Sequence, residues 1–322
     1  MDDSRTQVRE RESRWAVPVG LASIAAVILL IVMRPLNVSG DGEADLLTEA
    51  HAHTGSVVLS GLLQTLAFLL LALPLVYLFR AVQARSDRVR PQLIGLVIAA
   101  PLFLAASSAV AIAVTTDAAD SFVAGDVKPE LTASEAREEC TEEREDEGAD
   151  FLKDEYDPAQ GETPQRACED RKLADDAAKR ATREASLAPL ATGLSLAGLF
   201  GMIASLLYAG LWAMRTGLLS RFWGSLAMVA GISFLLGPLV LVALVWFAYF
   251  GLLCLGLVPG GRPPAWEAAE AIAWPTPGDR AAAELEPEGG WDESNVPDVG
   301  DEDDGDADDG EPPERRKRKQ RE

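Results

Sequence analysis

The sequence predicts an all-α integral membrane protein: a bundle of six, or alternatively five, transmembrane helices with an external acidic helical hairpin and a disordered acidic C-terminal tail. Two observations predict this class. Six apolar stretches contain no ionisable side chain, and four of them reach the roughly 20 residues that a helix needs to cross a hydrocarbon core about 30 Å thick. The charged residues gather in two segments between and after these stretches.

The apolar stretches set the limits of the regions. They run over residues 15–33, 55–79, 92–114, 187–214, 222–237 and 238–258. Residues 1–14 are therefore expected to form a cytoplasmic N-terminal segment, and 15–114 to hold transmembrane helices 1–3. Residues 115–186 form the external hairpin, 187–258 hold helices 4–6, and 259–322 form the tail, which the six-span topology places in the cytoplasm.

The last apolar block decides between six and five crossings. As one helix, residues 222–258 would be about 55 Å long, which is too long for a single span. Gly237 and Pro238 lie in the middle of the block and favour a break, because Pro suits the first turn of a new helix. The alternative is five spans, with one long kinked helix and an external tail.

The distribution of charge predicts the side of the membrane on which each loop lies. Of the 50 Asp and Glu residues, 22 lie in 115–186 and 19 in 259–322, and the net charge is −21. This acidity argues against nucleic-acid binding, which needs a basic surface. Arginines gather in 1–14 and directly after helices 2 and 4, and loops rich in Arg and Lys face the cytoplasm. We expect a multi-pass protein of the bacterial inner membrane with its N-terminus in the cytoplasm.

Helix 4 carries small residues at every fourth position, which places them on one face. They are Gly193, Ala197, Gly201, Ser205, Ala209 and Ala213. Membrane helices associate through close packing of such faces, because lipid solvates Leu as well as protein does. Helix 3 of the same chain is the expected partner, and a second copy of the chain or another membrane protein is the alternative.

A polar face enters the membrane at the outer ends of helices 2 and 3. It consists of His53, Ser56, Ser60 and Gln64 on helix 2, with Ser107 and Ser108 on helix 3. The helix 2 residues follow each other at spacings of three and four and therefore share one face. We interpret them as groups for interhelical hydrogen bonds, and alternatively as the lining of a small polar cavity that opens to the outside.

His51 and His53 are the two histidines of the chain. A His-x-His pair can bind a transition metal, with acids such as Asp45 or Glu49 completing the site. Residues two apart point away from each other on a helix, so chelation would need an extended segment. Solvated side chains are the simpler interpretation, and neither a metal nor a cofactor is predicted.

Two helices are predicted in the external segment. The first begins at Thr132, whose spacing to Glu135 has the form of a capping box. The second begins at Thr163, with Pro164 in its first turn, and runs almost directly into helix 4.

Cys140 and Cys168 would lie at similar heights in this antiparallel hairpin. Oxidising conditions outside the cell favour a disulfide between them, worth about 3–4 kcal/mol in the chain-entropy model. Two unpaired thiols are the alternative if the topology is inverted. Acid-then-base pairs such as Asp176 and Arg180 are expected to support the second helix.

Two short segments carry a resemblance to known sequences. Residues 215–224, which read Arg-Thr-Gly-Leu-Leu-Ser-Arg-Phe-Trp-Gly, and residues 259–275 resemble parts of uncharacterised multi-pass membrane proteins of GC-rich actinobacteria. The resemblance implies an inner-membrane protein and assigns no activity. Within the second segment a short helix is expected over 265–274, with Trp266 and Trp274 at the level of the lipid headgroups. The composition beyond it predicts disorder.

Motifs typical of enzymes are missing from the sequence. It contains no phosphate loop, no His-Glu-x-x-His and no Gly-x-Ser-x-Gly. The expected function is therefore non-catalytic, in membrane assembly, interaction or sensing through the hairpin and tail. The alternative is a small-solute transporter or channel that uses the polar face of helices 2 and 3. The lack of charges inside the apolar stretches favours the first.

Overall fold

The computed structural model describes residues 2–33, 42–147, 163–235, 240–259, 261–272 and 274. Within these ranges every regular element is a helix, which confirms the predicted all-α class. Four helices are long and apolar enough to cross a bilayer, which is the property of a membrane protein. They are α1 (Asp2–Val32), α3 (Thr54–Gln83), α4 (Ile94–Val123) and α8 (Ala188–Arg215).

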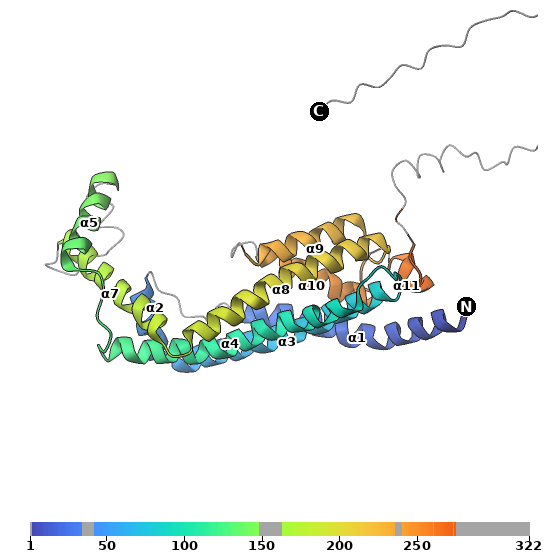
Figure 1. The fold of residues 1–322 in the computed structure, drawn as a ribbon, viewed down its shortest axis with the longest axis horizontal. Coiled ribbons are helices and arrows are strands. Elements are labelled where there is room, and N and C mark those ends of the chain that lie inside the picture. The colour runs from blue at the N-terminus through green and yellow to red at the C-terminus, as the bar shows by residue number, and fades with distance from the viewer. Residues whose placement is uncertain are drawn as a thin grey trace, which may run out of the picture. The chain divides into compact units, whose positions relative to one another are not determined.

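The other helical elements are shorter: α9 and α10 lie alongside the long helices, and the rest lie toward their two ends (Figure 1). They are α2 (Glu43–Ala52), the 3₁₀ turn η2 (Pro91–Leu93), α5 (Ala133–Glu147), α7 (Pro164–Glu184), α9 (Arg221–Ser233), α10 (Val240–Leu255) and α11 (Pro264–Ala268). We call the end that holds α11 and the start of α1 the proximal end. The end that holds α2, α5 and α7 is the distal end, and these three helices form the distal unit.

Two membrane-length helices extend beyond the limits expected from hydropathy. α1 begins at Asp2, so residues 2–14 form the first turns of that helix. α4 continues past the predicted end at Val114 as far as Val123. Arg and Glu are good helix formers and favour the extension of α1, whereas burial of Ala118 and Ala119 in a distal apolar core supports the extension of α4.

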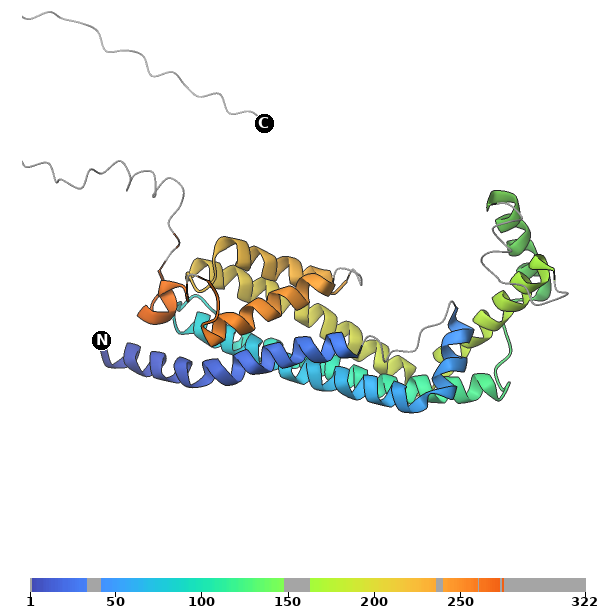
Figure 2. The ribbon, with the colours of Figure 1, turned by 180° about the vertical axis from the view of Figure 1, so that it is seen from behind.

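The main core forms where α4 packs against α3 and α8, and where α1 packs against α3 and α10 (Figures 1 and 2). Four of the small residues predicted to form a packing face on α8 are buried, namely Gly201, Ser205, Ala209 and Ala213. A Cβ atom on Gly201 would lie 2.9 Å from the Cβ of Ala100 in α4, so the predicted partner, helix 3, is confirmed. Gly193 and Ala197 are exposed and lie outside this contact.

The ambiguous apolar block contains two helices, α9 and α10, which pack side by side. Trp246 Nε1 donates to the carbonyl of Trp223 at 3.0 Å, and the Trp223 ring stacks on Tyr249. Their 13 and 16 residues correspond to about 20 and 24 Å, less than the bilayer thickness. The predicted break at Gly237 and Pro238 lies outside the described residues.

A second, smaller apolar core lies at the distal end and joins α2, α4 and α7. Its buried residues are Leu47, Ala50, Val114, Ala118, Ala119, Ala178, Ala181 and Ala185. Alanines on α4 and α7 allow the two helices to approach closely. Because α7 leads into α8 after only residues 185–187, the distal unit continues directly into the membrane helices, as predicted.

Candidate functional site

Two neighbouring aspartates of α7 hold the distal unit together. Asp175 Oδ1 accepts a hydrogen bond from the backbone N–H of Ala44 at 2.9 Å and so caps the N-terminus of α2. Asp176 Oδ2 accepts from the backbone N–H groups of Glu130 and Leu131 at 2.6 and 2.9 Å. α7 therefore fixes both the entry into α2 and the segment that follows α4.

The expected pair of Asp176 and Arg180 is replaced by other contacts. Arg180 pairs with Glu184 at 2.6 Å and, more loosely, with Glu130 at 3.7 Å. The N–H of Leu131 is the main cause that lowers the pKa of Asp176 below its ordinary value. An acid that accepts backbone hydrogen bonds gains more than it would from an exposed ion pair.

The hairpin of α5 and α7 has the predicted starts and the predicted crosslink. Thr132 and Glu135 form a capping box: Thr132 N donates to Glu135 Oε2 at 2.8 Å, and Glu135 N donates to Thr132 Oγ1 at 3.3 Å. The hydroxyl of Thr132 is the main cause that lowers the pKa of Glu135. Cys140 and Cys168 form a disulfide with their Cα atoms 6.1 Å apart, and both side chains are buried.

A hollow of about 370 Å³ lies beneath the distal unit, between α2, α3, α4 and α7. Three members of the predicted polar face line it, namely Ser60, Gln64 and Ser108. Glu43, Thr115 and Thr182 add polar groups to the wall. The hollow lies where the alternative interpretation placed a small polar cavity, and three of the six predicted residues line it.

The hydroxyl groups in the wall donate to their own helices. Ser60 Oγ donates to the carbonyl of Val57 at 3.1 Å, and Ser108 Oγ donates to that of Leu104 at 2.9 Å. The amide of Gln64 has no hydrogen-bond partner among the described residues. Gln64 is therefore the side chain best suited to bind a small polar molecule in the hollow.

The remaining members of the predicted polar face do not line the hollow. Ser107 Oγ donates to the carbonyl of Ala191 in α8 at 3.1 Å, which is the predicted interhelical hydrogen bond. His53 is exposed, and its Nδ1 lies 3.1 Å from a carboxylate oxygen of Glu49. Ser56 is half-buried.

The two histidines contact different carboxylates. His51 Nδ1 lies 2.9 Å from Asp120 Oδ1 of α4, whereas His53 is bound to Glu49. In the described part of the chain no group of three or more His, Cys, Asp or Glu side chains has the arrangement of a metal site. The structure therefore gives the weak candidate pair His51 and His53 no support as metal ligands.

The proximal end contains a buried ion pair that the sequence reasoning missed. Arg85 donates to both carboxylate oxygens of Glu12, at 2.6 and 2.9 Å. The Arg85 side chain is fully buried, and its Nε donates to the carbonyl of Ala265 near α11. Glu12 shares a helical face with the buried residues Ala16 and Val19, and this spacing was the signal that could have revealed it.

Trp266 belongs to the same cluster, and its side chain is buried among other residues of the protein. It is 6% exposed, and its ring stacks on Tyr77 with 5.6 Å between centroids. Its Nε1 donates to the carbonyl of Leu218 at 2.9 Å, and Arg85 lies 5.5 Å from its ring centre. The cluster thus ties α1, α3, α11 and the turn after α8 to one another.

No protein-family model matches the chain, and neither a curated protein nor a solved structure shows significant similarity to it. The resemblance at residues 215–224 and 259–275 therefore stays a prediction. What can be said of function follows from the distal unit, the hollow beneath it and the proximal cluster.

Proposed function

We propose that the chain is a non-catalytic, multi-pass protein of the bacterial inner membrane that acts through its distal unit, by binding or sensing a partner outside the cell membrane. The observation that carries this proposal is how the distal unit is attached. A separate apolar core joins α2 and α7 to α4, and Asp176 of α7 accepts hydrogen bonds from the segment that follows α4. Within the unit, Asp175 joins α7 to α2 and the disulfide joins α7 to α5. A unit attached in this way transmits a load or a displacement directly to the membrane helices.

The proposed orientation rests on where charges gather. The first turns of α1, the end of α3 and the end of α8 meet at the proximal end, and each carries arginines. The distal unit is rich in Glu and Asp. Since loops rich in Arg face the cytoplasm, the proximal end lies inside and the distal unit outside. A disulfide at Cys140 and Cys168 suits that oxidising side.

The proposal includes six crossings. α9 and α10 pack side by side, and α11, which follows α10 in the chain, contacts α1 at the proximal end. α9 and α10 are each too short to span an unperturbed bilayer as a straight helix. Packing against α8 and α1, with local thinning of the lipid, would offset this mismatch.

Labelling of single cysteines in intact cells tests the orientation. A cysteine at Glu138 in α5 should react with a membrane-impermeant maleimide, and one at Arg88 after α3 should react only after the cells are permeabilised. Both variants are built on a Cys254→Ser background, because Cys254 is the free thiol of the described residues. Labelling in the opposite order would contradict the orientation and leave the fold untouched.

Complementation tests whether the function depends on the distal unit. A strain that lacks the chain should not be rescued by a variant without residues 131–170, although that variant still inserts and keeps all membrane-length helices. A matched variant, Gln64→Leu with Ser60→Ala, should restore the wild-type phenotype, because it alters only the hollow.

Small-solute transport is the second candidate, and the hollow beneath the distal unit favours it. Below Gln64 the same face of α3 carries Ala67, Leu71 and Leu75, which are at most 1% exposed. These side chains form an apolar floor, so the hollow is a pocket open toward the distal end and not a path across the bundle. The opposite result would favour transport. If the Gln64→Leu, Ser60→Ala variant failed to rescue the strain that lacks the chain, and the variant without residues 131–170 did rescue it, small-solute transport would replace our proposal.

A further inference from the structure

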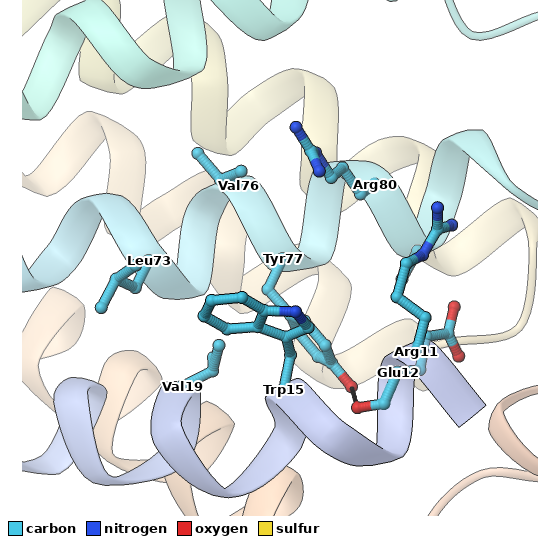
Figure 3. Close-up of a pocket in the computed structure, with 9 residues that line it drawn as sticks. Arg11, Glu12, Trp15, Val19, Leu73, Val76, Tyr77 and Arg80 are labelled. Atoms are coloured by element: carbon cyan, nitrogen blue, oxygen red, sulfur yellow. Dashed lines mark hydrogen bonds between the residues drawn. The ribbon is translucent and has the colours of Figure 1, made fainter. Parts of the chain in front are cut away.

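The proximal end carries a second hollow, on the outer surface of the bundle between α1 and α3. Its volume is about 210 Å³ (Figure 3). Figure 3 shows Arg11 and Arg80 toward one end of it and Leu73 and Val19 toward the other, with the indole of Trp15 between them. The hollow therefore has a cationic end and an apolar end.

Arg11 and Arg80 also border a neighbouring hollow of about 390 Å³, whose wall includes the amide of Gln83 and the start of η2. Arg11 and Arg80 thus line both hollows, at the cationic end of the first. A phosphate fits between guanidinium groups, which donate to its oxygens in a bidentate manner.

No carboxylate of the described residues neutralises the charges of these two arginines. Within the described ranges neither Arg11 nor Arg80 has a carboxylate within ion-pair distance. Glu12 lines the first hollow, but both of its oxygens accept hydrogen bonds from Arg85, which compensates its charge. The hollow therefore carries a net positive potential suited to an anion.

The apolar end is open to the surroundings of the bundle. Leu73 is 40% exposed and Trp15 is 51% exposed, and both lie on membrane-length helices. Exposed apolar side chains at this depth contact acyl chains, and tryptophan favours the interface between acyl chains and headgroups. One ligand that satisfies both ends carries a phosphate and a hydrocarbon chain.

We propose that the hollow between α1 and α3 binds an anionic phospholipid, with the phosphate between Arg11 and Arg80 and an acyl chain along Leu73 and Val76. Trp15 lies over the glycerol region. The inference rests on the proposed orientation only in assigning the lipid to the cytoplasmic leaflet, where basic pockets between membrane helices take anionic headgroups. Binding itself does not depend on the orientation.

The test uses the purified full chain in a neutral detergent and its thermal unfolding with three additives. Phosphatidylglycerol should raise the unfolding temperature, phosphatidylcholine with the same acyl chains should raise it much less, and inorganic phosphate should leave it unchanged. Native mass spectrometry of the same samples should show one retained phosphatidylglycerol. Equal stabilisation by both lipids, or stabilisation by inorganic phosphate alone, would overturn the proposal without bearing on the orientation.

A charge-matched pair of variants locates the site. The double variant Arg11→Gln, Arg80→Gln should bind phosphatidylglycerol about thirtyfold more weakly. Each arginine near the lipid surface contributes roughly 1 kcal/mol to binding, and the loss of both corresponds to this factor. Arg9→Gln with Arg88→Gln removes the same charge from exposed positions outside the hollow and should change the affinity less than about threefold. Equal losses in both variants would show a diffuse charge effect and overturn the site.

A third variant tests the apolar end while the charge is kept. Leu73→Trp fills that end of the hollow from an exposed position, so the fold should persist. It should weaken retention of phosphatidylglycerol in native mass spectra. Unchanged retention would overturn the assignment of an acyl chain to this end.

Discussion

At the scale of single residues, Arg85 shows how this protein holds a charge away from water. Its guanidinium makes four hydrogen bonds: two to Glu12, one to the carbonyl of Ala81 and one to the carbonyl of Ala265. Four of its five N–H groups are thus satisfied. Such a buried ion pair stabilises the fold little more than apolar residues of similar shape would. Removing one partner, however, leaves the other charge buried without compensation.

Replacing one partner of this pair should therefore cost more than replacing both. We expect Glu12→Ala to lower the free energy of unfolding by about 3–5 kcal/mol, because the Arg85 charge remains buried. Glu12→Leu combined with Arg85→Met should recover most of that loss. Thermal unfolding in detergent measures both, with Arg88→Ala as an exposed control near zero. A double variant as unstable as Glu12→Ala would contradict this account.

Protonation of Asp176 and Glu135 should loosen the distal unit in acid. The pKa of each carboxyl is lowered in the folded state, by the backbone N–H of Leu131 and by the hydroxyl of Thr132 respectively. Their stabilisation is complete above the ordinary values of 3.8 and 4.5 and is lost as the pH falls through the lowered values.

Amide hydrogen exchange of Glu130 and Leu131 measures this effect. Corrected for intrinsic rates, protection should be constant above pH about 5 and should fall below about 4. Asp176→Asn should remove the pH dependence while lowering protection throughout. Protection of these two amides that rises as the pH falls would contradict the prediction.

At the scale of elements, burial of a small-residue face depends on how far the partner helix lies alongside it. The face on α8 continues from Gly193 to Ala213, and among the glycines of α8 it is Gly201 and its neighbour Gly198 that α4 approaches closely, whereas Gly193 is open. A Cβ on Gly198 would lie 2.8 Å from the backbone nitrogen of Leu104. The periodic pattern therefore identifies the face, and the crossing geometry selects the residues that matter.

Two substitutions on this face should differ in cost. Gly201→Leu places a side chain against Ala100 and should destabilise the α4–α8 contact by about 1–3 kcal/mol. Gly193→Leu adds the same side chain where no atom lies within 4 Å, and should change stability by less than about 0.5 kcal/mol. Thermal unfolding of both variants measures the two losses of stability. Equal losses would contradict the close approach of α4 to Gly201.

At the scale of the whole described unit, two apolar cores follow each other along the same long helices. The larger lies among α1, α3, α4 and α8–α10, and the smaller lies among α2, α4 and α7. The smaller core is made mostly of alanines, which bury little area each. The distal unit thus depends on its hydrogen bonds and its disulfide more than the membrane helices do.

Removing the disulfide should affect only the distal unit. Cys140 and Cys168 are 28 residues apart, so Cys140→Ser with Cys168→Ser should lower the stability of the hairpin by about 3–4 kcal/mol in the chain-entropy model. Hydrogen exchange should accelerate in α5 and remain slow in the buried part of α8. Equal acceleration in both helices would show that the two cores unfold together.

Hydrophobic length and helical spacing were sufficient to predict the helical class, the presence of membrane-length helices, the hairpin with its capping box and disulfide, and α4 as the partner of α8. Six such helices were predicted, or alternatively five, whereas four helices of the described residues reach that length. These features depend on residues close in sequence or on a repeated face, so a local pattern determines them. The same patterns also predicted Ser60, Gln64 and Ser108 as members of one polar site.

Contacts between residues far apart in sequence were decided only by the tertiary structure. Glu12 and Arg85 lie 73 positions apart, and Trp266 reaches their cluster from a segment expected at the membrane surface. Asp175 caps a helix 131 positions away instead of pairing along its own helix. A charge or an indole carries no local mark of its partner, because the desolvation that makes the partner necessary arises only when the helices pack together.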